Sequence, residues 1–327
     1  MDATDAPPRP EFLALGAFYK TELEPWLESQ EGRRRKARLL RWLIIGGGLG
    51  LLAVCFFVVL TGDWSEFWFF VIFVLAIVVV AVGNIPISRL QSDVKKFVME
   101  KLAGFFSFRY AAQPDFPDAP YFTDLRLLPV HDKRNFEDGL EGEINGVAFR
   151  MVDAHLTQRR KSGKNHKDVT VFRGLLLCLP RAPTGEDAVA VWRSDVGQSV
   201  TGKGWGEVSV GDSAFDGTYT VHSDSAETAR RLLDRETRRA FAALDGREDV
   251  DEVRLGITHD RLLLAFNLGT DSFEAGKMNR ALADPNRVQE MVELFALPFD
   301  AVDGFKLRPA TAATAAVRDD AVAQGSA

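Results

Sequence analysis

Two long apolar runs near the N-terminus constrain this chain more than any other feature. They are Trp42–Leu60 and Trp64–Val82. Each run is long enough, at about 19 residues and ~1.5 Å per residue, for a helix to cross the hydrocarbon core of a bilayer. Neither run has a charge in its middle, and only a short polar segment separates them. One such run is compatible with a buried helix of a soluble protein. Two in series predict a transmembrane helical hairpin over residues 42–82.

The charges that flank these runs predict their orientation. Residues 33–41, before the first run, include six Lys or Arg. The second run is followed by Arg89, Lys95, Lys96 and Lys101. The six-residue loop 61–66, which includes the mouth of the second run, has Asp63 and Glu66 and no basic residue. Because basic residues near membrane spans remain cytoplasmic, we expect both termini in the cytoplasm. A cleaved secretory signal is disfavoured, since the first run begins late and a second span follows it.

The N-terminal arm, residues 1–41, has a helical pattern before the first span. Its apolar residues recur at steps of three and four: Phe12, Leu15, Tyr19, Leu23 and Trp26. This spacing predicts an amphipathic helix. The helix either packs on the soluble domain or lies in the membrane interface.

Gly46 and Gly50 form a Gly-x-x-x-Gly pair in the first span. Small residues at this spacing let helix backbones approach closely. We expect close packing within the hairpin; packing against a second copy and the absence of a special role are the alternatives.

The chain after the membrane segment predicts an α+β fold. Residues 83–120 are interpreted as an exit helix with a Pro-rich linker at 113–120, residues 121–308 as a cytoplasmic α+β domain, and residues 309–327 as a disordered tail. The exit helix has one apolar face, made by Leu90, Val94, Phe97, Val98 and Leu102. The expected domain is a mainly antiparallel sheet, open or as a half-open barrel, with two covering helices.

The elements of this domain follow from periodicity and turn residues. Strands are expected over 142–158, 168–180, 188–195, 206–210, 217–223, 252–258 and 261–268. One helix is expected over 224–244, capped by Asp224 or Ser225, and another from Asp284–Pro285, ending at Pro298. The strand over 142–158 takes its core side from Ile144, Val147, Phe149 and Met151 or Val152.

The composition excludes several classes of protein. The formal net charge is −6, which argues against a nucleic-acid partner. Cys55 and Cys178 are too few for a disulfide framework or a cysteine-rich metal site. The lipid bilayer and an unknown protein are the expected partners.

Three motifs resemble catalytic or metal sites but lack residues that such sites require. Residues 197–204 approach a phosphate-binding loop, but Gly204 replaces the required hydroxyl and a strand follows. Asp212 and Asp216–Gly217 lack the remaining oxygen ligands of a calcium loop. The histidines at 131, 155, 166, 222 and 259 lack zinc-site spacing, and His222 and His259 are expected to be surface or turn residues. We predict no catalytic residue, cofactor or metal site.

A basic loop is the best candidate for contact with an anion. It is expected at a hairpin tip and contains Arg159, Arg160, Lys161, Lys164 and Lys167. On a membrane-tethered domain such a loop can contact anionic headgroups. A solvated loop without a ligand is the alternative.

Two segments resemble a known family. They are Phe172-Arg173-Gly174 on a strand, and Phe215…Tyr219-Thr220-Val221-His222-Ser223-Asp224…Ala229-Arg230-Arg231-Leu232-Leu233. With the two preceding spans, they resemble the bacterial membrane-protein family called domain of unknown function 3137, from about Phe12 to about Phe305. Gly217-Thr218-Tyr219 stands where a Phe is expected. The resemblance implies a bacterial inner-membrane protein and no catalytic residues. Within the second segment, Arg230 is expected to pair with Asp224 or Asp216.

These features favour a non-enzymatic, membrane-anchored binding or scaffold protein. A sensor of anionic lipid or a small ligand is the first alternative. A membrane-tethered enzyme is the second, and the sequence leaves open whether any reaction is catalysed.

Overall fold

The computed structural model describes residues 9–62, 65, 67–162, 165–181, 188–196, 205–269, 272 and 281–309. It divides the chain into two compact units. The first comprises residues 1–102 and 274–290, and the second residues 103–273 and 291–327. Each unit is described separately below.

The first unit is helical. It begins with η1 (Pro10–Phe12), α1 (Leu15–Phe18) and a π-helical turn η2 (Tyr19–Leu23), followed by α2 (Glu24–Thr61) and α3 (Phe67–Phe105). Pro25 stands in the first turn of α2, which continues directly from η2. Both long helices are apolar enough to cross a membrane. Many of their large apolar side chains are exposed, including Leu43, Leu51, Phe57, Phe70 and Phe73.

Helices α2 and α3 pack against each other within this unit. The Trp26 and Phe97 rings stack with centroids 3.7 Å apart. A Cβ at Gly48 would lie 2.5 Å from Val79, and one at Gly83 would lie 2.5 Å from Ile45. Close approach of the two helices therefore depends on Gly48 and Gly83.

Gly46 and Gly50 have a different environment from the one expected within a hairpin. A Cβ added at either position meets no atom within 4 Å among the residues that the structure describes. Packing of this pair against a second copy stays a prediction.

The predicted face of the exit helix is confirmed. Leu90, Val94, Val98 and Leu102 are all buried in α3. From the N-terminal arm, Leu23 and Leu27 are fully buried. These two apolar positions of the N-terminal segment are therefore shielded from solvent.

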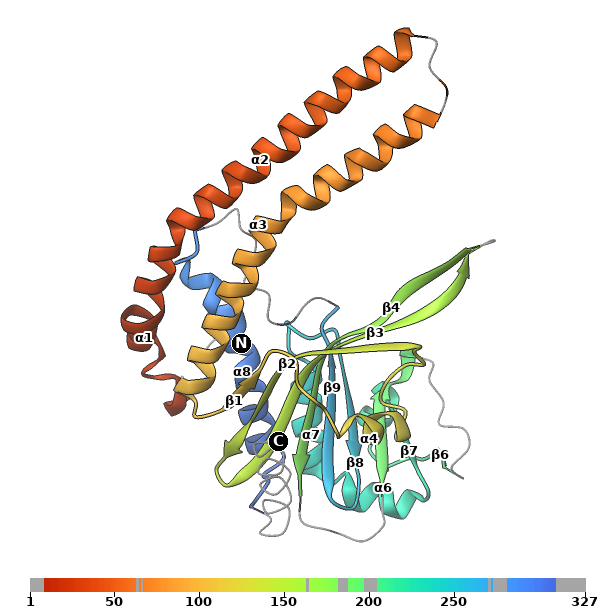
Figure 1. Cartoon of the computed structure of the whole chain (residues 1–327). Coiled ribbons are helices and arrows are strands. Elements are labelled where there is room, and N and C mark those ends of the chain that lie inside the picture. The colour runs from red at the N-terminus through yellow and green to blue at the C-terminus, as the bar shows by residue number, and fades with distance from the viewer. Residues whose placement is uncertain are drawn as a thin grey trace, which may run out of the picture. The chain divides into compact units, whose positions relative to one another are not determined.

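The second unit is built on a nine-stranded antiparallel sheet (Figure 1). Its strands are β1 (Arg109–Ala111), β2 (Lys133–Ile144), β3 (Val147–Ser162), β4 (Asn165–Pro180), β5 (Val189–Arg193), β6 (Gly206–Glu207), β7 (Tyr219–Ser223), β8 (Glu252–Ile257) and β9 (Arg261–Asn267). The spatial order is β1-β2-β3-β4-β9-β8-β5-β7-β6. The sheet stays open rather than forming a half-open barrel, and its two edge strands are its shortest, which limits edge-to-edge association.

Helices cover both faces of the sheet. They are α4 (Ala119–Asp124), α5 (Ser213–Thr218), α6 (Ala226–Leu232), α7 (Arg235–Asp245) and α8 (Pro285–Gly304), with the short η3 (Ser194–Val196) after β5. The α+β class is confirmed, with more helices than the two expected.

One face of the sheet is covered by the segment 116–128, which contains α4. Phe116, Phe122 and Leu127 are buried against sheet residues that include Trp192 and Leu263. Gly256 makes room for this segment, because a Cβ there would lie 2.6 Å from Leu125 and 2.7 Å from Leu127. Phe116, Asp118 and Ala119 are therefore buried, and the predicted linker over 113–120 is wrong for them. The prolines that suggested a linker flank a buried turn.

A buried carboxylate fixes this segment to the sheet. Asp118 is 2% exposed and accepts from Arg261 Nη1 at 2.7 Å and from Arg150 Nη1 at 3.2 Å. The Arg261 guanidinium also lies 4.3 Å from the Tyr121 ring centroid. Both arginines come from the sheet, on β9 and β3, so one carboxylate joins α4 to two strands.

The opposite face is packed by α7 and by α8 from Met291 onward. Phe106 stacks on Phe295 with centroids 5.6 Å apart, and Phe108 meets Phe149 of β3 edge-on at 4.7 Å. Further along the sheet, Tyr219 of β7 contacts Phe241 of α7 at 4.9 Å. Ile144, Val147, Phe149 and Met151 are buried as expected.

The single strand predicted over 142–158 is two strands. Asn145 and Gly146 have φ of 51° and 80° and form the turn between β2 and β3. Asn-Gly is the strongest short-range signal for a two-residue hairpin. Apolar and polar residues alternate on both sides of the turn, so the periodicity alone indicates one continuous strand.

Two helix boundaries also differ from expectation. The helix over 224–244 is interrupted at Leu233, because Asp234 caps a second helix through the Thr237 N–H at 2.7 Å. Ser225 caps the first, as predicted. Helix α8 continues past Pro298 to Gly304. Pro298 is buried and tolerated inside this helix.

Removing the Asp118 carboxylate tests how the segment 116–128 is held. In Asp118→Ala, Arg150 and Arg261 lose their shared buried partner, which is expected to cost about 3–5 kcal/mol of unfolding free energy. Urea unfolding of the solubilised full chain measures this loss, and hydrogen exchange over residues 116–128 is expected to rise. The control is Glu236→Gln, which removes an exposed pair with Lys306 and is expected to cost at most about 1 kcal/mol. Equal stability of both variants would contradict the role of Asp118.

Gly174 tests the packing of β4 on β9. A Cβ at this position would overlap the Phe266 carbonyl oxygen, a backbone atom that cannot rotate away. Gly174→Ala is therefore expected to destabilise the chain by at least about 1–3 kcal/mol. Gly217→Ala is the matched control, because a Cβ there meets nothing within 4 Å. The comparison uses urea midpoints, and equal midpoints for the two variants would refute the assignment.

Candidate functional site

The predicted basic loop lies at the tip of a hairpin formed by β3 and β4. The two strands pair from Arg150–Cys178 out to Ser162–Asn165. Strand β2 begins opposite Thr157, and β9 ends opposite Gly174, so the described residues 158–162 and 165–169 form strand pairs only with each other. We call this two-stranded ribbon, residues 158–169, the arm; Figure 1 shows it extending beyond the other strands of the sheet.

The arm places like charges opposite each other. Arg160 stands opposite Lys167 across the strands. Like charges at directly opposed positions destabilise a strand pair. Arg159 stands opposite Asp168, whose carboxylate accepts from Lys133 Nζ at 2.6 Å, and this hydrogen bond holds the pKa of Asp168 below its usual value. Lys164 lies outside the described residues.

The acidic groups of the rejected calcium loop serve local structure. Asp212 caps α5 by accepting from the Phe215 N–H at 3.3 Å. Asp216 accepts from Ser209 Oγ at 2.7 Å and from the Val210 N–H at 3.1 Å. No cluster of three or more metal-ligating side chains occurs within the described part of the chain. Residues 197–204, the approximate phosphate-binding loop, lie outside it.

Arg230 is not found in either expected ion pair, with Asp224 or with Asp216. In the described residues, Asp216 accepts instead from Ser209 and from the backbone of Val210 and Gly211.

His222 is buried, against the expectation of a surface or turn residue. It lies on β7, is 7% exposed, and stacks on Trp192 with centroids 4.8 Å apart. Neither ring nitrogen has a hydrogen-bond partner among the described residues. Burial lowers the pKa of its imidazole. His259, in contrast, is an exposed residue of the turn between β8 and β9, as predicted.

The buried cysteine has the character of a core residue. Cys178 is 1% exposed, and burial raises the pKa of its thiol. A protonated thiol is a poor nucleophile. Cys178 and Cys55 are both free, in agreement with the sequence.

Sequence reasoning missed a carboxylate at the end of α7. Asp245 is 2% exposed and accepts from Arg193 Nε at 2.8 Å, from Tyr219 Oη at 3.0 Å and from the Val253 N–H at 2.9 Å. Burial and the nearby carboxylate raise the pKa of Tyr219. These contacts join α7 to β5, β7 and β8 and give Asp245 a structural role.

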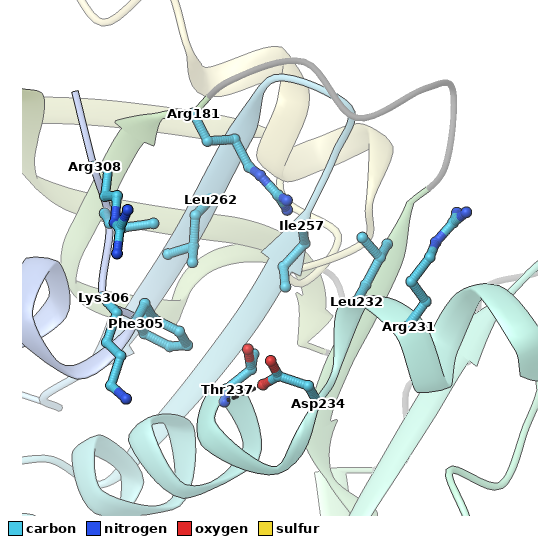
Figure 2. Close-up of a pocket in the computed structure, with 11 residues that line it drawn as sticks. Arg181, Arg231, Leu232, Asp234, Thr237, Ile257, Leu262, Phe305, Lys306 and Arg308 are labelled. Carbon is cyan, nitrogen blue, oxygen red and sulfur yellow. Dashed lines mark hydrogen bonds between the residues drawn. The ribbon is translucent and has the colours of Figure 1, made fainter. Parts of the chain in front are cut away.

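Sequence reasoning also missed a basic pocket of about 390 Å³. Its residues come from the end of β4, from α6 and α7, from β8 and β9, and from the residues after α8, as Figure 2 shows. Four lining side chains are cationic: Arg181, Arg231, Lys306 and Arg308. They are scattered over 128 positions of sequence, so no local motif marks them.

The part of the chain from the middle of β4 to the end of α8 matches a known family model. Residues 170–307 match the family described as Protein of unknown function (DUF3137). The resemblance to this family is confirmed over that range, which runs from within β4 to just beyond α8 and includes both quoted segments.

The other comparisons add little. A search of curated proteins gives no match. The crystal structure of the mycobacterial trehalose monomycolate transport factor A, TtfA, is similar with a TM-score of 0.35 and 16% sequence identity. The similarity covers 62% of this chain and 94% of that one. At this score the likeness does not bear on function.

The buried imidazole of His222 predicts a pH dependence of stability. Its folded pKa lies below the unfolded value near 6.5, so the unfolded chain binds the proton more tightly. The contribution of His222 is complete above that value and is lost as the pH falls below it, by at most about 1.4 kcal/mol per pH unit. In urea unfolding at pH 8 and pH 5.5, His222→Phe is expected to show a smaller loss than the natural chain, because Phe retains the stacking on Trp192. An unchanged pH dependence would contradict this assignment.

Proposed function

We propose that this protein is a bacterial inner-membrane protein that binds a protein partner through its β domain without catalysing a reaction. In this proposal α2 and α3 form a transmembrane hairpin, both termini are cytoplasmic, and the β domain acts as a scaffold. The arm is the contact surface.

The exposed apolar side chains of α2 and α3 support the membrane anchor. Phe57, Phe70 and Phe73 are each more than 60% exposed. A contiguous apolar surface of this kind is unfavourable in water and favourable in a bilayer. The basic residues of segment 33–41 favour a cytoplasmic position for the adjoining helix end.

The charge arrangement of the arm is the observation that carries the binding proposal. Arg160 and Lys167 are opposed on a ribbon to which, among the described residues, no third strand is paired at these two positions. Their repulsion weakens the ribbon, and an anionic surface beside it would relieve that repulsion. The arm also concentrates positive charge in a chain whose net charge is −6. We infer that its partner presents an acidic surface.

Site-specific photocrosslinking in native membranes tests this proposal. A benzophenone amino acid at position 161, in the arm, is expected to give a discrete crosslinked protein band. The control is the same probe at position 227, an exposed residue of α6, which is expected to give no crosslinked band. Arg160→Gln with Lys167→Gln is expected to lower the yield several-fold, because two exposed charge contacts are lost.

The crosslinked product distinguishes the possible partners. A single protein crosslinked at 161 and identified by mass spectrometry supports the scaffold. Crosslinks to anionic lipid alone favour the lipid-sensor alternative. Equal yields at 161 and 227, or yields that the paired Gln substitutions leave unchanged, would refute a role for the arm.

A further inference from the structure

The basic pocket has the composition of a ligand site for an anion with an apolar part. Leu232, Ile257 and Leu262 line it and are each less than 10% exposed. Phe305 and Leu307 add apolar surface. Its volume of about 390 Å³ lies in the range of small-molecule sites, which pair apolar walls with a few polar groups.

Arg181 is the most buried of the four cationic side chains that line the pocket. It directly follows β4, and its backbone N–H donates to Asp260 O at 2.7 Å. Figure 2 shows its guanidinium directed toward Ile257. Among the described residues no carboxylate forms an ion pair with it, and burial lowers the pKa of the guanidinium. Partial burial of a cation without a carboxylate partner is unfavourable, and a bound anion would offset that cost.

Lys306 occupies a position where glycine is normally preferred. It lies two residues beyond the end of α8 and has a φ of 50°. The Leu307 N–H donates to Val302 O at 3.0 Å, and the Lys306 N–H donates to Asp303 O at 3.1 Å. This is the left-handed residue of a helix C-terminal motif, which favours Gly because a Cβ is strained there. A lysine here strains the backbone, whereas a glycine would not, but only the lysine places a positive charge at the pocket. Backbone strain of this kind is concentrated at functional sites.

The acidic neighbours of the pocket are already engaged. Asp234 accepts from the Thr237 N–H as the cap of α7. Glu236 pairs with Lys306 at 2.6 Å, but both side chains are about 60% exposed, so a ligand can replace this contact at little cost. The lining itself carries four cations and one carboxylate.

We propose that this pocket binds an organic phosphate. Arg181, Lys306 and Arg308 hold the phosphate oxygens, since guanidinium and ammonium groups form charge-assisted hydrogen bonds with them. The apolar part of the ligand lies on Phe305 and Leu262. This site is distinct from the arm and does not depend on the proposed protein partner.

Calorimetric titration of inorganic pyrophosphate tests the pocket directly. The full chain is used in phosphatidylcholine nanodiscs, and one saturable site is expected. Arg181→Gln and Arg308→Gln are each expected to weaken binding about tenfold or more. Arg235→Gln is the matched control, because it removes the same charge from an exposed residue next to the pocket that does not line it. Its affinity is expected to remain within about twofold of the natural chain.

Lys306→Gly separates binding from folding. It relieves the left-handed strain, so its melting temperature is expected to equal or exceed that of the natural chain. Its affinity for pyrophosphate is nevertheless expected to fall. A loss of affinity in a chain that is at least as stable excludes misfolding as the cause.

Nanodiscs that contain phosphatidic acid identify the source of the phosphate. If a lipid headgroup is the natural ligand, these nanodiscs weaken pyrophosphate binding by competition; if a soluble organic phosphate is, the affinity is unchanged. Either result supports the site when the pocket variants lose affinity. Absence of saturable binding, or equal losses in Arg235→Gln and Arg181→Gln, would overturn the proposal.

Discussion

The ion pairs of Asp118 hold one face of the β domain together. The segment 116–128 is short, and its only helix, α4, has six residues, too few for stability in isolation. Asp118 joins it to β3 and β9 through Arg150 and Arg261. A second buried cation, Arg254 of β8, donates to Leu127 O at 3.0 Å and to Glu252 on its own strand. These contacts orient Phe122 and Leu127 over a sheet face that would otherwise be exposed to water.

Segment 116–128 covers one face of the sheet and α7 and α8 pack the other, while two groups of cations lie at its margins. The arm extends β3 and β4 beyond their neighbours, and the basic pocket lies where β4, β8 and β9 meet α7 and the end of α8. In the core, Arg150 and Arg254 each have a carboxylate partner, and the partly exposed Arg193 pairs with the buried Asp245. In the arm, Arg160 faces Lys167 instead. This contrast is the physical basis for assigning binding to the margins and stability to the core.

The errors of sequence reasoning had specific causes. Asn145–Gly146 was a readable hairpin signal, but apolar alternation continued across it. Asp234 was a readable helix cap, yet the apolar spacing of Ala229, Leu233 and Phe241 fits one continuous helix. Pro298 favours a helix end because it lacks an N–H and its ring crowds the preceding turn, but the ring contacts of Phe295 and Phe299 hold α8 on both sides of it. In each case tertiary packing determined which of two local signals prevailed.

By itself, the sequence determined the two apolar helices, the α+β class, the family resemblance, and the arm as a basic hairpin tip. These properties depend on local composition and on periodicity within one or two elements. Only the tertiary structure decided that Phe116 and Asp118 are buried, that His222 is buried on Trp192, and that Gly174 lies against the Phe266 backbone. It also decided that Arg181, Lys306 and Arg308 share one pocket. Each of these outcomes joins residues far apart in the chain, and strand order, which local patterns do not encode, sets which of them meet.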